Sequence, residues 1–134
     1  MSDEMTQWDL KQKCKELEKY NGWTNYETWA VGLWIDNDEF TQRRAQELGK
    51  EMLKNAPHDE NVKGKIWTVC ETAKFRLAEQ LEEQYENDNP LLNEESSLYS
   101  DLMNASLGNV NWDEVAEQYL PESCVNKLRK QRRR

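Results

Sequence analysis

Apolar side chains recur at steps of three and four residues along most of this chain, which is the spacing of one face of an α-helix. No stretch shows the alternation of β-branched and polar residues that is typical of a strand. The predicted helices cover approximately residues 5–20, 25–36, 38–55, 60–87 and 94–107, followed by two short helices on either side of Pro121. The sequence therefore predicts an all-α fold, a compact single domain of six or seven helices.

The longest predicted helix, at about residues 60–87, has the most regular apolar face. Its members are Val62, Ile66, Val69, Cys70, Ala73, Leu77, Leu81 and Tyr85. Pro90 ends the helix because proline disfavours helical geometry at the preceding residue, Asn89. Trp67 falls off the apolar face, so it either widens the buried surface or stays exposed for a partner.

Residues 21–35 form the stretch around which we expect the core to be organised. Asn21 and Gly22 tolerate positive φ, which suits the end of a preceding helix. Thr24 and Glu27 have the S/T-x-x-E spacing of a capping box. The apolar face expected to anchor the core consists of Tyr26, Trp29, Ala30, Leu33 and Trp34. Because the neighbouring charges are acidic, we favour burial of these rings over stacking on nucleotide bases.

Three other helices have apolar faces at helical spacing. In the helix at 38–55, which Asp36–Glu39 would cap, the face is Ala45, Leu48, Gly49, Met52 and Leu53. In the helix at 94–107 it is Leu98, Leu102 and Ala105. In the helix that starts near Asn111, it is Trp112, Val115, Ala116 and Tyr119. Asn111 and Glu114 have the spacing of a helix cap.

Two stretches of the chain resemble the signatures of a family of small proteins from phages, plasmids and other mobile elements. The opening signature covers Tyr20-Asn21-Gly22-Trp23-Thr24-Asn25-Tyr26-Glu27-Thr28-Trp29 and Leu33-Trp34-Ile35-Asp36-Asn37-Asp38-Glu39. The closing signature covers Asp101-Leu102-Met103-Asn104-Ala105 and Val110-Asn111-Trp112-Asp113-Glu114-Val115-Ala116. Together they bracket residues 20–120. The resemblance implies an origin in a mobile element and an uncharacterised family, and it supplies no catalytic residues.

Length and composition limit the class of protein. The chain has 134 residues, of which 37% are hydrophobic and 33% charged, and its six Trp indicate a packed core in one domain. No segment approaches the roughly 18 apolar residues of a membrane span, and the charged N-terminus lacks the apolar core of a signal peptide. We therefore expect a protein of the host-cell cytoplasm with no membrane contact.

The reactive residue types give no catalytic or metal-binding pattern. Cys14, Cys70 and Cys124 are odd in number, widely spaced and not arranged as C-x-x-C, so we expect buried reduced thiols and no disulfide or zinc site. His58 is the one histidine, which leaves most nucleophile–base pairs without a base. We expect no cofactor and a protein that is not an enzyme, although the abundant carboxylates leave metal-dependent hydrolysis as an open alternative.

The net charge of −8 is the average of two very different parts. The last eight residues contain six basic residues, namely Lys127, Arg129, Lys130, Arg132, Arg133 and Arg134. Without these six, 12 of the 18 basic residues remain against 26 acidic ones. We therefore predict an acidic helical domain at residues 1–126 and a basic, disordered tail at residues 127–134.

The acidic residues concentrate between Glu79 and Asp101, where there is no Lys or Arg. The predicted partner-binding residues are Glu79, Glu82, Glu83, Glu86, Asp88, Glu94 and Glu95, with Trp67 and Trp23 as secondary contacts. Four of these carboxylates repeat at three and four residues, so we expect them to share one outward helix face. The simpler alternative is a solvated acidic surface that keeps a small protein soluble.

These patterns lead to one main functional hypothesis and two alternatives. The main hypothesis is a non-enzymatic mobile-element protein that inhibits a host defence complex of the CRISPR or restriction type, with its acidic surface as a nucleic-acid decoy. The first alternative is a nucleic-acid-binding accessory protein that uses the basic tail. The second is a protein that sequesters a small nucleotide in a pocket lined by Trp23, Tyr26 and Trp29.

Overall fold

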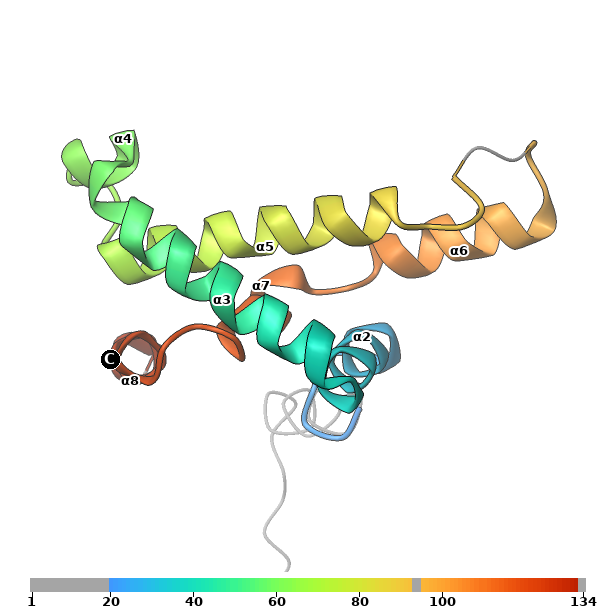
Figure 1. Cartoon of the computed structure of the whole chain (residues 1–134), viewed down its shortest axis with the longest axis horizontal. Helices are drawn as coiled ribbons and strands as arrows, with labels where there is room; N and C mark the ends of the chain where they lie inside the picture. The colour runs from blue at the N-terminus through green and yellow to red at the C-terminus, as the bar shows by residue number, and fades with distance from the viewer. Residues whose placement is uncertain (1–19, 93–94, 133–134) are drawn as a thin grey trace, which may run out of the picture.

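The computed structural model of the chain describes residues 20–92 and 95–132, and within them the fold is all-α, as predicted (Figure 1). The predicted helix at 5–20 lies almost entirely outside these residues. The described elements are α2 (Tyr26–Asn37), α3 (Glu39–Asn55), the 3-10 turn η1 (Ala56–His58), α4 (Glu60–Lys63), α5 (Val69–Asn87), α6 (Leu98–Gly108), α7 (Trp112–Glu117) and α8 (Glu122–Arg132).

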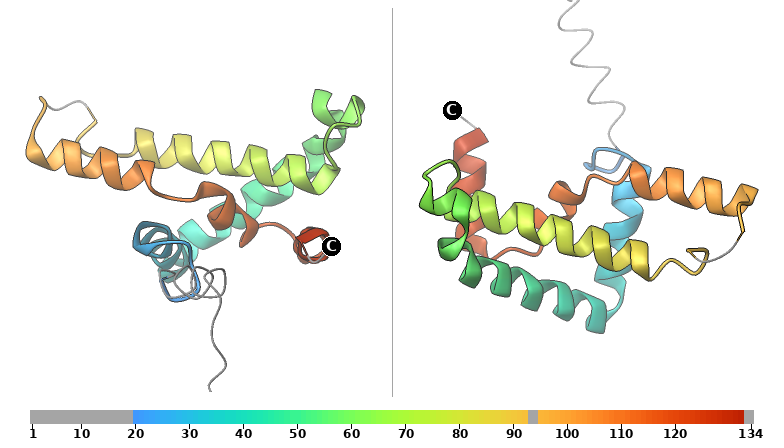
Figure 2. Two further views of the ribbon diagram at one scale, coloured as in Figure 1. Left: turned by 180° about the vertical axis from the view of Figure 1, so that it is seen from behind. Right: turned by 90° about the horizontal axis from the view of Figure 1, so that it is seen from above.

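Helix α5 is the longest element, and the other helices are arranged along it. Helices α3, α7 and α8 all pack against α5, and α2 packs against α3 and α7. The views in Figures 1 and 2 agree that α4 lies at the N-terminal end of α5, whereas α6 extends past its C-terminal end. Helix α8 lies on the side of the molecule away from α6 (Figures 1 and 2).

The core lies where α5 meets α7 and α3. Here Ala73, Leu77 and Leu81 of α5 and Val115 and Ala116 of α7 are at most 1% exposed. Cys70, Ala73, Leu77 and Leu81 all belong to the apolar face that the sequence predicts for the longest helix. The α7 prediction is also confirmed, because Trp112, Val115, Ala116 and Tyr119 are all buried.

The predicted helix at 60–87 is wrong in one respect, because the structure divides it into α4 and α5. Lys65 has φ 59°, a left-handed conformation, and the amides of Ile66 and Trp67 both donate to the carbonyl of Asn61, the second residue of α4. Thr68 then begins α5, with its hydroxyl oxygen accepting a 3.2 Å hydrogen bond from the amide of Glu71. Ile66, predicted to be buried, is 70% exposed at this break.

The predicted core face of α2 is also wrong. The buried residues of this helix are Thr28, Gly32 and Ile35, whereas Trp34 is 75% and Tyr26 56% exposed. Apolar side chains occur nearly all round α2, so periodicity alone does not select the buried side. Packing selects the side of Thr28, Gly32 and Ile35, where the missing side chain of Gly32 leaves room for the Trp23 ring. Trp29 and Ala30 are half-buried and Leu33 is exposed.

The turn before α2 follows the sequence prediction only in part. Asn21 and Gly22 have φ values of 48° and 88°, as their residue types predict, and Tyr20 and Trp23 exchange two backbone hydrogen bonds of 2.8 Å across them. The capping box at Thr24 does not form. Instead, Asn25 begins α2, and its side-chain oxygen accepts a 2.9 Å hydrogen bond from the amide of Thr28.

Helix α6 presents its predicted apolar face to solvent instead of to the core. Leu98 and Leu102 are 67% and 57% exposed, and Ala105 is also exposed. The opposite side of the helix faces the chain through Ser100, which is buried, and Leu107, which packs partly against the core. The helix starts at residue 98 and lies beyond the end of α5. Its apolar face therefore has no surface of α5 to pack against.

The expectation of reduced cysteines is wrong for two of the three. Cys70 of α5 and Cys124 of α8 form a disulfide, with their Cα atoms 5.3 Å apart, and both are buried as expected. The pairing was not predictable because 54 residues separate the two cysteines in sequence. Cys14 lies outside the described residues.

The expected disordered tail from residue 127 is wrong as far as Arg132, because α8 continues to that residue. Leu128 is 5% exposed and belongs to the core, so it fixes this turn of α8 against the protein. The basic residues therefore follow a folded helix, and the predicted boundary at residue 126 falls inside it. Arg133 and Arg134 lie outside the described residues, as does the side chain of Arg132.

Candidate functional site

The predicted acidic residues lie mostly on the exposed side of α5. Glu79, Glu83, Glu86 and Asp88 are exposed, as is Glu95 in the connection to α6, whereas Glu82 is half-buried. Glu94 lies outside the described residues. The three- and four-residue spacing therefore produces an outward row on α5 in which Glu82 is the least accessible member.

A cleft between α3 and α5 adds acidic residues that the sequence did not connect with this row. We refer to it as the acidic cleft; its volume is about 470 Å³, and its charged lining consists of Arg44, Glu47, Glu51, Glu83 and Asp88. Glu47 and Glu51 are four residues apart on α3 and so lie on one side of that helix. Because α3 crosses α5, the two helices bring acidic residues about 35 positions apart in sequence to one surface (Figure 1).

Glu79 differs from the other acids of the row because a cation accompanies it. Arg76 donates hydrogen bonds to Glu79 at 3.1 Å and to Asp59 at 2.9 Å. These contacts raise the pKa of Arg76, with the Asp59 bond as the main cause. The same bond from Arg76, helped by the amide of Asn61, lowers the pKa of Asp59. Part of the charge at this end of the row is therefore balanced within the chain.

Tyr85 lies beside the acidic cleft and responds to its charges. The half-buried ring stacks on Trp112, with centroids 5.9 Å apart and an interplanar angle of 17°. Burial raises the pKa of the phenol, and Asp88 raises it further, while Arg44 opposes them. This aromatic contact connects α5 to α7.

The two tryptophans predicted as secondary contacts both have neighbours within the chain. Trp67 is half-buried and meets Phe75 edge-on, with ring centroids 5.0 Å apart. Trp23 packs over α2 at Gly32, where an added Cβ would lie 3.0 Å from two atoms of the indole ring. Neither lines the acidic cleft, so the structure does not bring them together with the acidic row.

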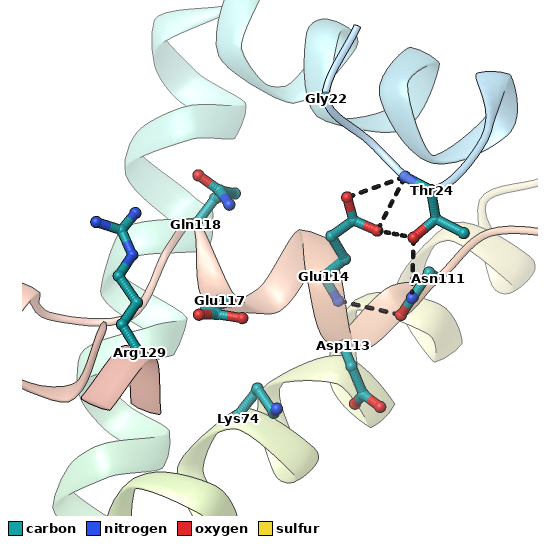
Figure 3. Close-up of a pocket in the computed structure, with 9 residues that line it drawn as sticks. All are labelled: Gly22, Thr24, Lys74, Asn111, Asp113, Glu114, Glu117, Gln118 and Arg129. Atoms are coloured by element: carbon teal, nitrogen blue, oxygen red, sulfur yellow. Dashed lines mark hydrogen bonds between the residues drawn. The ribbon is translucent and has the colours of Figure 1, made fainter. Parts of the chain in front are cut away.

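A second pocket, of about 460 Å³, lies between the turn at Gly22, α5, α7 and α8 (Figure 3). Its charged lining residues are Lys74, Asp113, Glu114, Glu117 and Arg129. Figure 3 shows that the carboxylate of Glu114 is directed at Thr24, from which it accepts hydrogen bonds from the amide at 3.1 and 3.2 Å and from the hydroxyl. Glu114 is thereby committed to holding the turn.

This polar pocket is not the one that nucleotide sequestration would require. Gly22 and Thr24 line it, but the rings of Trp23, Tyr26 and Trp29 do not. The rings of Tyr26 and Trp29 instead form a cluster with Tyr20, with centroid separations of 4.9 to 5.6 Å. The lining of mixed charge can hold a small polar ligand, but it offers no aromatic surface for stacking a base.

The basic residues of α8 are divided between two surroundings. Lys127, Arg129 and Lys130 are all exposed, and of these Arg129 lines the polar pocket.

In residues 20–92 and 95–132 there is no group of three or more His, Cys, Asp or Glu arranged to hold a metal ion. Over the same residues no helix has the length and apolar character needed to cross a membrane.

Comparison with known proteins identifies the family. A model of the family of unknown function DUF7249 matches residues 16–128, which is most of the chain. The chain belongs to the DUF7249 family. No curated protein and no solved structure matches it.

The DUF7249 match contains the whole acidic cleft, because residues 44–88 all fall within it. It ends at residue 128, so Arg129 and Lys130 of α8 lie beyond it. The expected membership in an uncharacterised family is thus confirmed, and the match extends slightly past the predicted limits of residues 20 and 120 at both ends.

Sequence reasoning missed two parts of these sites. Glu47 and Glu51 have the i, i+4 spacing that would have placed them on one face of their helix, but nothing in the sequence indicates that this face meets α5. The contact of Glu114 with Thr24 joins residues 90 positions apart, and the sequence assigned both to local caps. For Thr68, a signal was present, because Thr68 and Glu71 have the spacing of a capping box.

Proposed function

We propose that this protein is a non-enzymatic inhibitor that binds a nucleic-acid-binding protein of a host defence complex and occupies the surface that would otherwise bind nucleic acid. The observation that carries the proposal is the acidic cleft, where Glu47 and Glu51 of α3 lie beside Glu83 and Asp88 of α5. The exposed carboxylates of Glu79 and Glu86 extend this surface along α5.

The charge distribution supports the proposal beyond the cleft itself. No Lys or Arg occurs between Arg76 and Lys127, so the C-terminal part of α5, α6 and α7 carry acidic charges only. On α5, acids four residues apart are about 6 Å apart along the axis. This is sparser than the phosphates of a duplex, which supply a charge about every 1.7 Å of axis, so the second row on α3 is needed to raise the local density.

An acidic surface of this kind suits a partner whose own surface is basic. Carboxylates there would meet the Arg and Lys side chains that normally contact phosphates, and the field would accelerate association. The stacking of Tyr85 on Trp112 holds the part of α5 that carries Glu83 and Asp88 against α7.

The type of partner follows from the resemblance to mobile-element proteins. A phage or plasmid gains directly from a protein that blocks restriction or CRISPR nucleases, and these enzymes hold nucleic acid in positively charged channels. The finer proposal is therefore an anti-restriction or anti-CRISPR protein that acts in the host cytoplasm, with a defence nuclease complex as its partner.

Cleavage assays with a panel of purified restriction and CRISPR effector complexes test this proposal. We expect inhibition of at least one nuclease, with a stable complex on size-exclusion chromatography. The variant Glu83→Lys with Glu86→Lys should weaken that complex by about tenfold or more, because it replaces exposed acids that would face basic side chains of the partner. High salt should weaken the wild-type complex in the same direction.

The matched control changes the net charge equally at another place. Glu60→Lys with Glu122→Lys alters exposed acids at the starts of α4 and α8, away from the acidic cleft. Inhibition should survive this change once folding has been checked by circular dichroism. The proposal is wrong if no nuclease in a broad panel is inhibited, and the acidic cleft is not the contact if both double variants behave alike.

The exposed lysines of α8 favour a second candidate, a nucleic-acid-binding accessory protein. Lys127 and Lys130 are exposed on a folded helix, so they could contact phosphates without regard to sequence. Deletion of residues 127–134 would also remove Leu128 from the core, so Lys127→Gln with Lys130→Gln is the better test. This candidate requires a gel shift of DNA or RNA at low salt that the double variant loses.

A further inference from the structure

The outer side of α6 is an apolar surface that the described part of the chain leaves uncovered. Leu98, Tyr99 and Leu102 are each more than half exposed, and Ala105 continues the line of Leu98 and Leu102 at helical spacing. The inner side of the helix meets the rest of the chain through Ser100 and Leu107. Helix α6 thus has one face for its own fold and a second, larger apolar face that is exposed.

A separate groove of about 330 Å³ lies on the inner side of α6, towards α5. It is lined by Glu86, Asn89 and Leu92 on the side of α5 and by Asn104, Leu107 and Gly108 of α6. Leu92 is 51% exposed at its edge. Glu86 belongs both to this groove and to the acidic row of α5, and the exposed apolar face of α6 lies on the other side of that helix.

The charged residues of α6 and of the segment that leads into it are all acidic. Glu95 and Asp101 are exposed there, and the nearest basic residues in sequence are Arg76 and Lys127. Figures 1 and 2 show that α6 extends away from α8, so the lysines of that helix do not lie beside it. An apolar surface with an acidic rim is the counterpart of an apolar surface with a basic rim.

The sign of the rim distinguishes between the occupants that could cover α6. A second copy of this chain docked face to face would bring its own Asp101 and Glu95 against the same residues, and such like-charge contacts cost binding energy. A helix with Lys and Arg on both sides of an apolar stripe instead satisfies both the apolar and the acidic parts.

We propose that the outer face of α6 forms a docking surface for a basic amphipathic helix of the partner protein. This inference rests on the proposed function and identifies which part of the partner contacts α6. Leu98, Tyr99 and Leu102 supply the apolar contact that fixes position, while Glu95 and Asp101 pair with the basic residues that flank the stripe. The acidic cleft then meets the rest of the partner's basic surface.

The experiment uses the full chain and a labelled model peptide of Leu and Lys, about 14 residues long, patterned as an amphipathic helix of nearly four turns. Fluorescence anisotropy should show that the wild-type protein binds this peptide at least about tenfold more tightly than a scrambled peptide of the same composition. Leu98→Gln with Leu102→Gln should weaken binding of the patterned peptide by about tenfold or more. Glutamine is chosen because it preserves helix propensity in α6.

Two exposed apolar residues elsewhere provide the matched control. Phe40 and Ile66 are 71% and 70% exposed, and Phe40→Gln with Ile66→Gln should leave peptide affinity unchanged. Circular dichroism shows whether each variant is folded. If the α6 variant binds as wild type does, or if the patterned and scrambled peptides bind equally, the inference is overturned. It is also overturned if sedimentation shows a dimer that Leu98→Gln with Leu102→Gln dissociates, because a second copy would then cover α6.

The outcomes separate this inference from the proposed function. Specific peptide binding through α6 without inhibition of any nuclease would keep the docking surface and remove the proposed defence role. Nuclease inhibition that is equal in wild type and in the α6 variant, together with unchanged peptide binding, would keep the proposed function and remove the docking surface.

Discussion

Gly49 of α3 lies directly against the backbone of Tyr119, and a Cβ atom on Gly49 would be only 2.2 Å from the Tyr119 carbonyl oxygen. The same Cβ would lie 3.4 Å from a methyl carbon of Leu77 in the core. This contact lets α3 cross closely over the segment that follows α7, and it sets how near α3 and α5 come at the acidic cleft. The absence of a side chain at position 49 is therefore a packing requirement.

Gly49→Ala should lower the free energy of unfolding by about 3 kcal/mol or more, because the added methyl overlaps backbone that cannot move aside easily. Urea unfolding followed by tryptophan fluorescence measures this loss. Gly108→Ala is the control, since no atom lies within 4 Å of a Cβ at that position, the last of α6. It should be neutral or stabilise by up to about 1 kcal/mol. Equal effects of the two substitutions would contradict the close crossing.

Tyr119 connects the segment after α7 to α2 through its side chain. Its hydroxyl donates a 2.7 Å hydrogen bond to Oδ1 of Asp36. Tyr119→Phe removes this bond and should cost about 1 kcal/mol of unfolding free energy at neutral pH. Tyr99→Phe removes a phenol that is 72% exposed and should have no measurable effect.

Ionisation of the Tyr119 phenol should lower the stability of the protein at alkaline pH. Burial, followed by the bond to Asp36, raises the pKa of Tyr119 well above its usual value of 10.0. Because the pKa of Tyr119 is higher in the folded than in the unfolded protein, the stabilisation by its protonated phenol is fully present below about pH 10. This stabilisation is lost as the pH rises towards the pKa of the folded protein. Unfolding free energy measured at pH 9 and about pH 11 should fall less in Tyr119→Phe than in wild type. An equal fall in both proteins would show that Tyr119 is not the group responsible.

The disulfide between Cys70 and Cys124 attaches α8 to the start of α5 across 54 residues of sequence. Reduction should lower the free energy of unfolding by about 2–4 kcal/mol, because it releases a constraint on the unfolded chain. The measurement is best made in a Cys14→Ser background, where urea unfolding with and without reductant reports on this bond alone. Peptide mapping under non-reducing conditions should recover the linked pair, and two titratable thiols in that background would contradict the pairing.

The contact of Glu114 with Thr24 should matter for the turn that carries Trp23. Glu114→Ala removes an acceptor of bonds from both the amide and the hydroxyl of Thr24, and we expect a loss of about 1–2 kcal/mol. Tryptophan emission should also shift to longer wavelength as the turn loosens. Asp113→Ala is the control, because this neighbour is exposed and has no hydrogen bond to the turn. Similar losses in both variants would indicate a general effect of charge on α7.

Several elements were predictable because their determinants are local. Asp38 caps α3 through bonds to the amides of Phe40 and Thr41, as its residue type and position predict. Asn111 caps α7 in the same manner. The apolar face of α7 was also correct, since only one side of that helix is apolar and the others are charged. The exposed acids of α5 follow for the same reason.

Other features required the tertiary structure because sequence spacing leaves them undetermined. Helix α2 is apolar on several sides, and only its contacts decide that Thr28 and Ile35 are buried while Trp34 is exposed. The acidic cleft depends on how α3 crosses α5, and the disulfide depends on where α8 docks. Each of these joins residues far apart in the chain, which local periodicity cannot relate.

The sequence by itself determined the all-α class, most helix boundaries and which residues carry the acidic charge. Only the tertiary structure decided which helix faces are buried, how acids of α3 and α5 gather at one cleft and why the apolar face of α6 stays exposed. The physical reason is that helix formation and capping depend on residues within about four positions of one another, whereas packing depends on shapes brought together from distant parts of the chain.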